Sequence, residues 1–311
     1  MEYADRMGVR ADLLTWQGVR SLAQIEAVTL GRELAMVAMD TSKPPLKLDP
    51  DAWMQTAVHQ MPVAGDIVYA RMAWRHPWRN QLVDQVTVPI VMVGHFYDPS
   101  IKAMAVDTLL RPGSPVQHWF GVQADVAHPK LTVMPLGVEP AMVPVLQAAE
   151  IRAEKDIDLY LNFQTVRVFH FPTGGSHSMV DAPRTQLWQH FAGRDWVTAD
   201  PFNEADPAHY ARQLGRAKFV LSPPRWGWDC YRTYEAIAMG AIPIVQRKRP
   251  TTDHLEALPV LLVDHWSEVT RARLQREWDQ RREHDLSLLT MSYWQRRIRM
   301  EAAKAVEECA A

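Results

Sequence analysis

The chain has 311 residues, a formal net charge of −2, 47% hydrophobic residues and 23% charged residues. This composition is typical of a globular protein and excludes a largely disordered chain. The charge balance lacks the basic excess that most nucleic-acid-binding proteins carry. The length predicts two domains of about 150 residues each.

The sequence has no apolar run close to the roughly 18 residues that a membrane-spanning helix needs. Its first residues, MEYADRMGVRAD, contain acidic side chains where a signal peptide has an apolar core. We therefore expect a cytoplasmic protein without a membrane span. Cys230 and Cys309 are too few for a disulfide framework or a zinc site.

The first half is expected to begin with a helix from about Gly18 to Met39 and to continue with strands and helices. Apolar runs at 67–70 and 89–94 predict buried strands. His95 and Asp98 follow the second run directly, where α/β enzymes commonly place reactive side chains. The alternative is that both side chains form a turn and cap the following helix.

Further strands are predicted at 117–124 and 131–136, followed by a linking helix at 141–155. A strand at 158–163, which Asn162 ends, opens the second half of the chain. The glycine-rich stretch 173–177 is either a loop that closes over a ligand or an exposed connection.

The most informative stretch is residues 218–245, which read KFVLSPPRWGWDCYRTYEAIAMGAIPIV. Two short apolar runs predict parallel strands. Asp229 is placed to cap the helix between them, and Gly240 ends that helix. In such a unit, ligands bind at the carboxyl end of the first strand, before the helix.

Arg232 and Glu235 share one face near the start of that helix, because they are three residues apart. A helix dipole contributes only about 0.3–1 kcal/mol toward a pyrophosphate, whereas a charge-assisted bond contributes about 1.5–3 kcal/mol. Arg232 is therefore the expected phosphate ligand, and Glu235 can accept from a ribose diol. The alternative is a salt bridge within the helix, worth about 0.3–0.5 kcal/mol.

The same stretch resembles the donor-binding motif of exostosin-like glycosyltransferases, in which Ser-Pro, a glycine-bearing loop, Asp, Arg and Glu-Ala precede Gly-x-Ile-Pro-Ile-Val. The matching residues are Ser222, Pro223, Gly227, Asp229, Arg232, Glu235, Ala236, Gly240, Ile242, Pro243, Ile244 and Val245. A second stretch, HWFGVQADVAHPKLTVMPLGVEP, resembles another segment of this family. It does so through Trp119, Phe120, His128, Pro129, Lys130, Leu131, Pro135 and Gly137.

The resemblance implies an α/β protein with a GT-B-like fold, in which two Rossmann-like domains with parallel sheets face a central cleft. Residues 1–150 would form the acceptor-side domain and residues 151–290 the nucleotide-sugar-binding domain. A last helix, 291–311, would cross back to the first domain.

The resemblance also implies the residues of a sugar-nucleotide site. Arg184 is expected to help Arg232 hold the diphosphate. Trp226 and Trp228 either stack on a base or sugar or wedge the domains together. The full set of donor-binding candidates is Arg232, Glu235, Asp229, Gly227, Ser222, Arg184, Asn162 and Trp228.

A sugar nucleotide can be held through a metal bound by Asp-x-Asp after a strand, or through arginines and a helix start. Asp156 and Asp158 form an Asp-x-Asp that precedes its strand and so faces the wrong end of the sheet. We therefore expect no metal and no prosthetic group, and a UDP- or GDP-sugar as the co-substrate.

The first hypothesis is therefore a hexosyl- or pentosyltransferase that acts on a hydroxyl group of a glycan or small molecule. Asp98 and His95 are the candidate bases if transfer inverts configuration, whereas Asp98 only binds the acceptor if transfer retains it. A second hypothesis is glycosylation of hydroxylated bases in DNA, with the cluster 74–79 as a stacking and phosphate-binding surface. A third is a non-catalytic binding or scaffold protein on the same fold.

Overall fold

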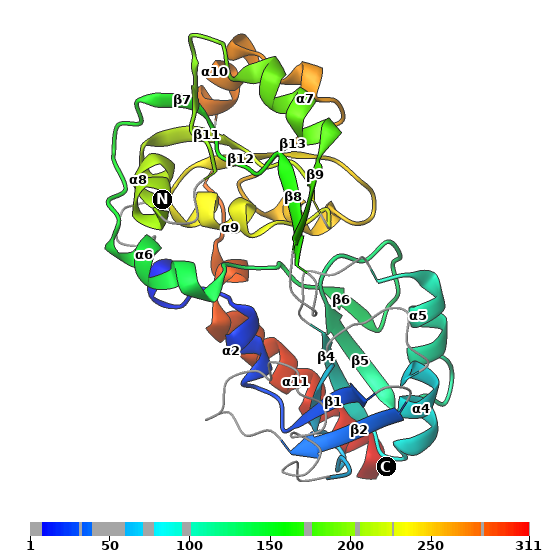
Figure 1. Ribbon diagram of the computed structural model, residues 1–311. Helices are drawn as coiled ribbons and strands as arrows, with labels where there is room; N and C mark the ends of the chain where they lie inside the picture. The colour runs from blue at the N-terminus through cyan, green and yellow to red at the C-terminus, as the bar shows by residue number, and fades with distance from the viewer. Residues whose placement is uncertain are drawn as a thin grey trace.

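The structure is a computed structural model that describes residues 8–30, 33–38, 60–70, 78–94, 101–170, 176–202, 206–225, 227–280 and 283–310. These residues form two α/β units, each built around a sheet of mainly parallel strands (Figure 1). The predicted mixed α/β class with parallel sheets is therefore confirmed. None of the described helices combines the length and apolar character needed to cross a membrane.

The N-terminal unit is a six-stranded sheet with the order β2-β1-β3-β4-β5-β6. Only β2 runs antiparallel to its neighbour. The strands are β1 (Ile25–Leu30), β2 (Glu33–Ala38), β3 (Ile67–Ala70), β4 (Ile90–Gly94), β5 (Val116–Gly121) and β6 (Leu131–Val133).

The helix predicted from Gly18 to Met39 is wrong. A short helix α2 (Trp16–Arg20), capped by the Thr15 side chain, is followed by the antiparallel pair β1 and β2. The Leu, Ala, Glu and Met residues of this segment favour a helix only weakly, and pairing of β1 with β3 overrides that preference.

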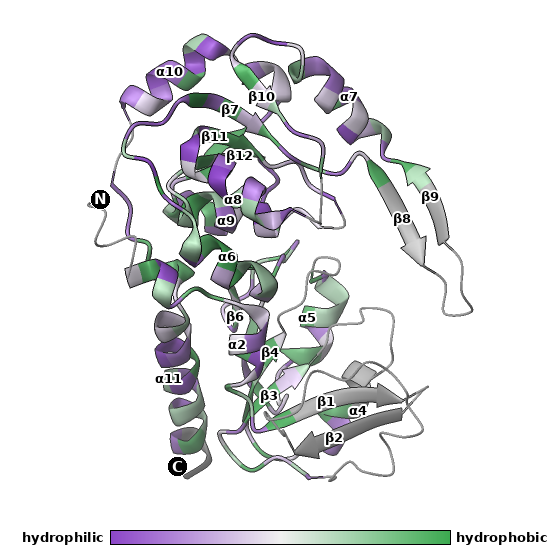
Figure 2. Ribbon diagram, turned by 60° about the vertical axis from the view of Figure 1, so that its left-hand side comes forward, coloured by the Kyte–Doolittle hydropathy of each residue, from purple (hydrophilic) through white to green (hydrophobic). Residues whose placement is uncertain are grey.

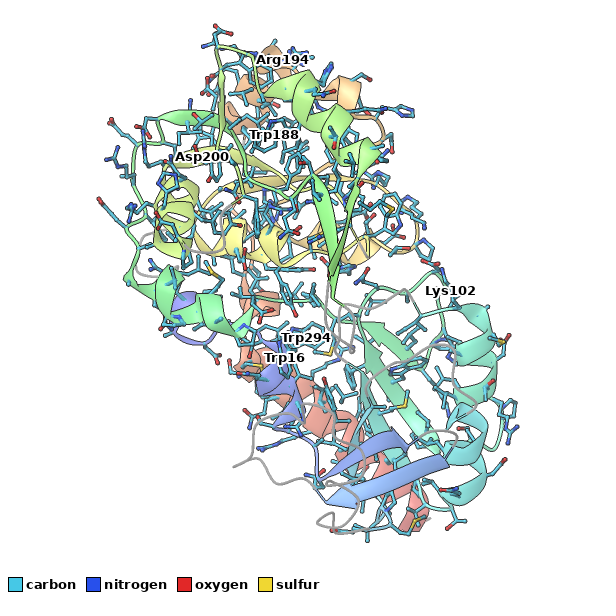
Figure 3. All side chains as sticks on the ribbon, in the orientation of Figure 1. Trp16, Lys102, Trp188, Arg194, Asp200 and Trp294 are labelled. Atoms are coloured by element: carbon cyan, nitrogen blue, oxygen red, sulfur yellow. The ribbon has the colours of Figure 1, made fainter. Side chains whose placement is uncertain are left out.

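Helices cover both faces of the N-terminal sheet. On one face, α4 (Trp78–Gln85) and α5 (Ala103–Leu109) bury an apolar cluster that includes Leu82 and Leu109. On the other face lie α2 and the long helix α11 (Met291–Ala310), which buries Trp294 and Ile298 against the sheet. Trp16 and Trp294 lie near the junction of the two units (Figure 3).

A short connection joins the units. It consists of the 3-10 turn η1 (Pro140–Met142) and α6 (Val143–Ala148), so the linking helix ends earlier than predicted. The apolar cluster under α11 continues across this connection to Leu146 and on to Val220 of the second sheet. The two units therefore share one core.

The C-terminal unit is a five-stranded, fully parallel sheet with the order β10-β7-β11-β12-β13. The strands are β7 (Ile157–Leu161), β10 (Val197–Ala199), β11 (Ala217–Leu221), β12 (Ile242–Gln246) and β13 (Leu261–Val263). The strands predicted at 158–163 and at both ends of 218–245 are present as β7, β11 and β12, and β10 and β13 complete the sheet.

Helices also cover both faces of this second sheet, whose apolar strands β11 and β12 lie in the middle of the unit (Figure 2). On one face are α7 (Ala182–Phe191) and α10 (Arg271–Asp279), and on the other are α8 (Pro207–Arg216) and α9 (Tyr231–Ala238). The remaining elements are the antiparallel pair β8 (Val166–His170) and β9 (Ser176–Val180), and the 3-10 turns η2 (Asp253–Ala257), η3 (Trp266–Glu268) and η4 (Ser287–Leu289).

The strand order reverses direction at β7, because the chain next forms β10 on one side of it and then β11 on the other. Connections from β7 and β11 therefore leave toward opposite faces, and a crevice opens between their carboxyl ends. This topological switch point is the place where an open parallel sheet binds its ligand.

We predict that Ile298→Ala destabilises the protein by about 2–5 kcal/mol, because the side chain is fully buried between α11 and the N-terminal sheet. Met300→Ala, two residues along the same helix, removes a side chain that is 48% exposed and should change stability far less. Urea unfolding of both variants measures the difference. Equal losses would contradict the packing of α11 on the sheet.

Candidate functional site

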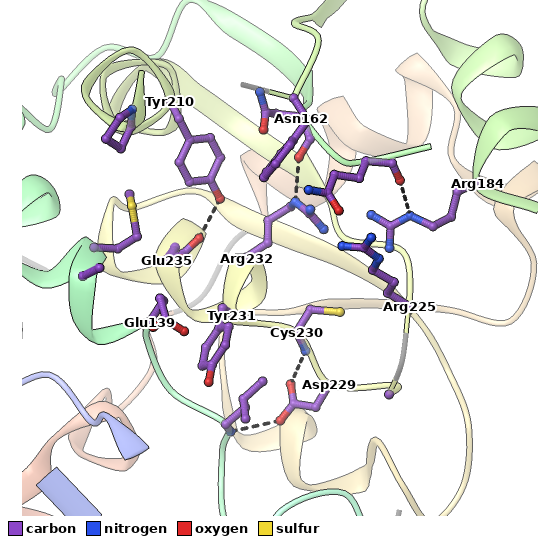
Figure 4. Close-up of a pocket in the computed structure, with 17 residues that line it drawn as sticks. Glu139, Asn162, Arg184, Tyr210, Arg225, Asp229, Cys230, Tyr231, Arg232 and Glu235 are labelled. Carbon is purple, nitrogen blue, oxygen red and sulfur yellow. Dashed lines mark hydrogen bonds between the residues drawn. The ribbon is translucent and has the colours of Figure 1, made fainter. Parts of the chain in front are cut away.

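A cavity of about 620 Å³ opens at the switch point, at the carboxyl ends of β7 and β11 (Figure 4). Its lining comes from both sheets and from the connection between the units. Asn162 and Gln164 follow β7, and Leu136 and Glu139 follow β6. The loop between β11 and α9 contributes Arg225, Gly227, Asp229 and Cys230, and the first turn of α9 contributes Tyr231 and Arg232.

Three arginines, Arg184, Arg225 and Arg232, line one side of this cavity. The Arg232 guanidinium donates to the Asn162 carbonyl at 2.8 Å and lies 5.8 Å from the centroid of the Phe163 ring. The Arg184 guanidinium lies 5.1 Å from the same centroid. Helices α7 and α9 and the loop after β11 thus bring three positive charges to one side of the cavity.

Arg184 is buried and fixed by backbone carbonyls. Its Nε donates to Gln164 at 2.7 Å, and its Nη1 donates to Pro223 at 3.2 Å and Pro224 at 3.0 Å. Burial, followed by repulsion from Arg232, lowers the pKa of Arg184 to about 9. An anion bound in the cavity would offset the free-energy cost of keeping Arg184 charged.

Glu235 lies one turn into α9 and is buried on the other side of the cavity. Tyr210 of α8 donates its hydroxyl to Glu235 Oε2 at 2.8 Å. Burial raises the pKa of Glu235 to about 7, and the nearby charge of Glu139 adds to the rise. Burial also raises the pKa of Glu139. The alternative considered from the sequence, a salt bridge from Arg232 to Glu235, does not form, since Tyr210 and the Asn162 carbonyl are the observed partners.

Gly227 is required by a close approach between the units. A Cβ atom at this position would lie 1.9 Å from Oε1 of Gln123, which follows β5 in the N-terminal unit. A side chain at this position would therefore displace the buried Gln123 amide from its place against the loop after β11. Gln123 itself is fully buried and has φ of 53°, a conformation that asparagine tolerates more readily than glutamine.

The structure brings together most of the donor-binding candidates. Arg232, Glu235, Asp229, Gly227, Arg184 and Asn162 all line the cavity. Ser222 lies beneath it, where its Oγ is 3.0 Å from the Thr233 hydroxyl. Trp228 lies outside the cavity lining, with the Lys248 ammonium 4.7 Å from its ring centroid.

Other predicted residues lie outside the part of the chain that the structure describes. These are His95, Asp98, Trp226 and most of the cluster at 74–79. Residues 173–175 of the glycine-rich stretch also lie outside it, and β9 begins at Ser176. Asp156 and Asp158 bind Arg216 and Lys218, at the end of β7 away from the cavity. Among the described residues, no three His, Cys, Asp or Glu side chains group as a metal site.

Sequence reasoning missed several residues of the cavity. Arg225 follows the Pro-Pro pair of the key loop, and Glu139 lies two residues after the Pro-x-Gly motif, so both are close to recognised motifs. Tyr210 gave no signal, because only the crossing of α8 over α9 brings it to Glu235. Phe202, which follows β10, also gave no signal.

Residues 193–302 match the family model described as the RXYLT1 C-terminal domain. This part of the chain is therefore similar to a domain of the exostosin-like family. The exostosin-like region thus contains β11, α9, Arg232 and Glu235, whereas Asn162 and Arg184 precede it. The match supports a glycosyltransferase. No curated protein sequence matches the chain.

Two solved structures resemble the chain at 10% sequence identity. One is the GtfA/B complex, with a TM-score of 0.38, 79% of this chain covered and 55% of that chain. The other is the pneumococcal O-GlcNAc transferase GtfA in complex with UDP and GlcNAc, with a TM-score of 0.35 and coverages of 89% and 63%. The chain thus spans little more than half the length of these proteins.

We predict that Glu235→Gln stabilises the protein at pH 8 but not at pH 4. The native state holds the Glu235 proton up to about pH 7, whereas the unfolded state releases it near the model-compound value of 4.5. The free energy of unfolding of the wild type therefore falls by up to about 3 kcal/mol as pH rises from 4.5 to about 7. The Glu235→Gln variant avoids this loss, because glutamine does not titrate. Chemical unfolding across this pH range measures the gain.

Tyr210→Phe should shift stability at high pH in the opposite direction to Glu235→Gln, because it removes the hydrogen bond that favours ionised Glu235. It should steepen the loss of stability at high pH. A Glu235→Gln gain that is the same at both pH values would contradict the buried position of this carboxyl group.

Proposed function

We propose that the protein is a glycosyltransferase that moves a sugar from a nucleoside-diphosphate sugar to a hydroxyl acceptor without a metal. The observation that carries this proposal is the convergence of Arg184, Arg225 and Arg232 on one cavity at the switch point. Arginines bring the charge and the planar hydrogen-bond geometry that a diphosphate requires. The exostosin-like match over 193–302 supports the same conclusion.

The diphosphate would bind at the start of α9. Arg232 has its Nε held by the Asn162 carbonyl, which aims the rest of the guanidinium at the ligand. Burial, and then repulsion from Arg232, lower the pKa of Arg184, so keeping this arginine charged costs free energy. A ligand with about two negative charges would offset that cost, and the dipole of α9 adds a smaller contribution.

The nucleoside would extend along the other wall of the cavity. Glu235, oriented by Tyr210, is placed to accept from a ribose diol. Phe202, Met142 and Pro207 supply an apolar surface beyond it, suited to the face of a base. UDP- and GDP-sugars are the donors that we propose.

The acceptor would approach from the N-terminal unit. Its hydroxyl oxygen attacks the anomeric carbon, and the bond to the diphosphate breaks with the electron pair leaving on phosphate oxygen. For transfer with inversion we propose Asp98 or His95 as the base that takes the hydroxyl proton. Both follow β4, which ends at Gly94 beside Gly121 of β5, on the side of Gln123.

The direct test is the release of nucleotide from a panel of UDP-, GDP- and ADP-sugars, with and without hydroxyl acceptors. We expect turnover with at least one donor, and we expect EDTA to leave it unchanged. Binding of a nucleoside diphosphate without turnover of any donor would instead favour a non-catalytic binding protein. Loss of activity with EDTA would contradict the metal-independent route.

We further predict that Arg232→Ala weakens binding of the matching nucleoside diphosphate by about tenfold to a hundredfold, the equivalent of one charge-assisted bond. Arg247→Ala is the control, because Arg247 pairs with Glu256 outside the cavity. Isothermal titration calorimetry compares the two. Equal affinity in both variants would remove Arg232 from the donor site.

A further inference from the structure

The carboxylate of Asp229 has hydrogen-bond partners within the protein on both of its oxygens. Its Oδ1 accepts from the Cys230 backbone N–H at 2.9 Å. Its Oδ2 accepts from the Leu136 backbone N–H at 3.0 Å and from the Tyr234 hydroxyl at 2.5 Å, and it lies 3.3 Å from His254 Nε2. The side chain is 4% exposed.

These contacts leave Asp229 little capacity for a ligand. An ionised carboxylate offers about four lone-pair sites. Three donors and the His254 ring nitrogen already surround this one. Its negative charge would also repel a diphosphate. Although Asp229 borders the cavity, its chemistry is unsuited to binding the donor.

Two of the hydrogen bonds at Asp229 join the units. The carboxylate accepts from Leu136, which follows β6 of the N-terminal unit. The Asp229 backbone N–H donates to Oε1 of Gln123, which follows β5, at 3.3 Å. Both cross from the loop after β11 to the carboxyl edge of the N-terminal sheet, where Gln123 also packs against Gly227.

We propose that Asp229 is a positioning residue that fixes the loop after β11, and with it the bound donor, against the acceptor side of the N-terminal unit. Tyr234 and His254, both in the C-terminal unit, contact the carboxylate and fix its position. The carboxylate in turn accepts from Leu136 of the N-terminal unit. The expected effect on turnover rests on the proposed function. The clamp, meaning the hydrogen bonds of Asp229 to Leu136 and Gln123, does not.

The test compares Asp229→Ala with Asp229→Asn. Alanine removes every acceptor, whereas asparagine loses the charge but keeps one oxygen that Leu136 and Tyr234 can share. Hydrogen exchange of the peptide covering 131–142 should accelerate by about tenfold or more in Asp229→Ala and stay near wild type in Asp229→Asn. Exchange in β7 and β11 should not change, which separates a local release from global unfolding.

Binding and turnover complete the test. Arg184 and Arg232 are held by carbonyls of the C-terminal unit itself, so UDP affinity should remain close to wild type in both variants. The rate constant for nucleotide release should fall in Asp229→Ala and recover in Asp229→Asn, at an unchanged KM for the donor. Tyr160→Phe, which removes a buried hydrogen bond within the C-terminal unit, is the control and should change none of these.

Two outcomes would overturn the proposal. One is unchanged exchange at 131–142 in Asp229→Ala, and the other is about tenfold weaker UDP binding in both Asp229 variants, which would make Asp229 a ligand. If Asp229→Ala does not fold, Gln123→Met removes the second link and should accelerate exchange in the same region. If the wild type binds none of UDP, GDP and ADP, the proposed function fails while the exchange data still decide the clamp.

Discussion

The hydrogen bonds of Arg184 set the geometry on which the site depends. One guanidinium joins the loop after β7, through Gln164, to the loop after β11, through Pro223 and Pro224. These are the two loops that meet where the strand order reverses. Pairing of β7 with β11 places their first residues side by side, and the Arg184 bonds join the loops beyond the strand ends. The result is a rigid pair of loops that presents Arg232 and Arg225 to the cavity.

Charge is divided within this cavity in a way that suits a sugar nucleotide. The guanidinium groups gather on one wall, while Glu235 and Glu139 occupy the other and resist ionisation because they are buried. A carboxyl group that is half protonated near neutral pH can both donate to and accept from hydroxyl groups. The proposed function assigns the arginine wall to a diphosphate and the carboxyl wall to a ribose.

The sequence predicted the local parts of this arrangement and missed the parts that depend on distant contacts. The strand, loop and helix around Arg232 were correct because prolines and glycines fix them within about twenty residues. The segment 18–39 failed because its strands exist through pairing with β3. Tyr210 could not be found, because its partner Glu235 is 25 residues away and only helix crossing joins them.

Asp229 illustrates the limit of reasoning from a motif. Its position in the motif suggested donor binding, and the cap it was expected to provide is reduced to one bond to Cys230, the residue directly before α9. The contact that distinguishes Asp229 is the hydrogen bond from the Leu136 backbone N–H, and Leu136 lies 93 residues earlier in the chain. A motif gives the order of residues along the chain, but the role of each depends on which element folds against it.

The packing of α11 has a consequence for biosynthesis. Trp294 and Ile298 close a face of a sheet whose own strands end at Val133, more than 150 residues earlier in the chain. During translation, the part of that face that α11 covers stays exposed until the whole second sheet has been made. The first sheet to be synthesised is thus the last to complete its core.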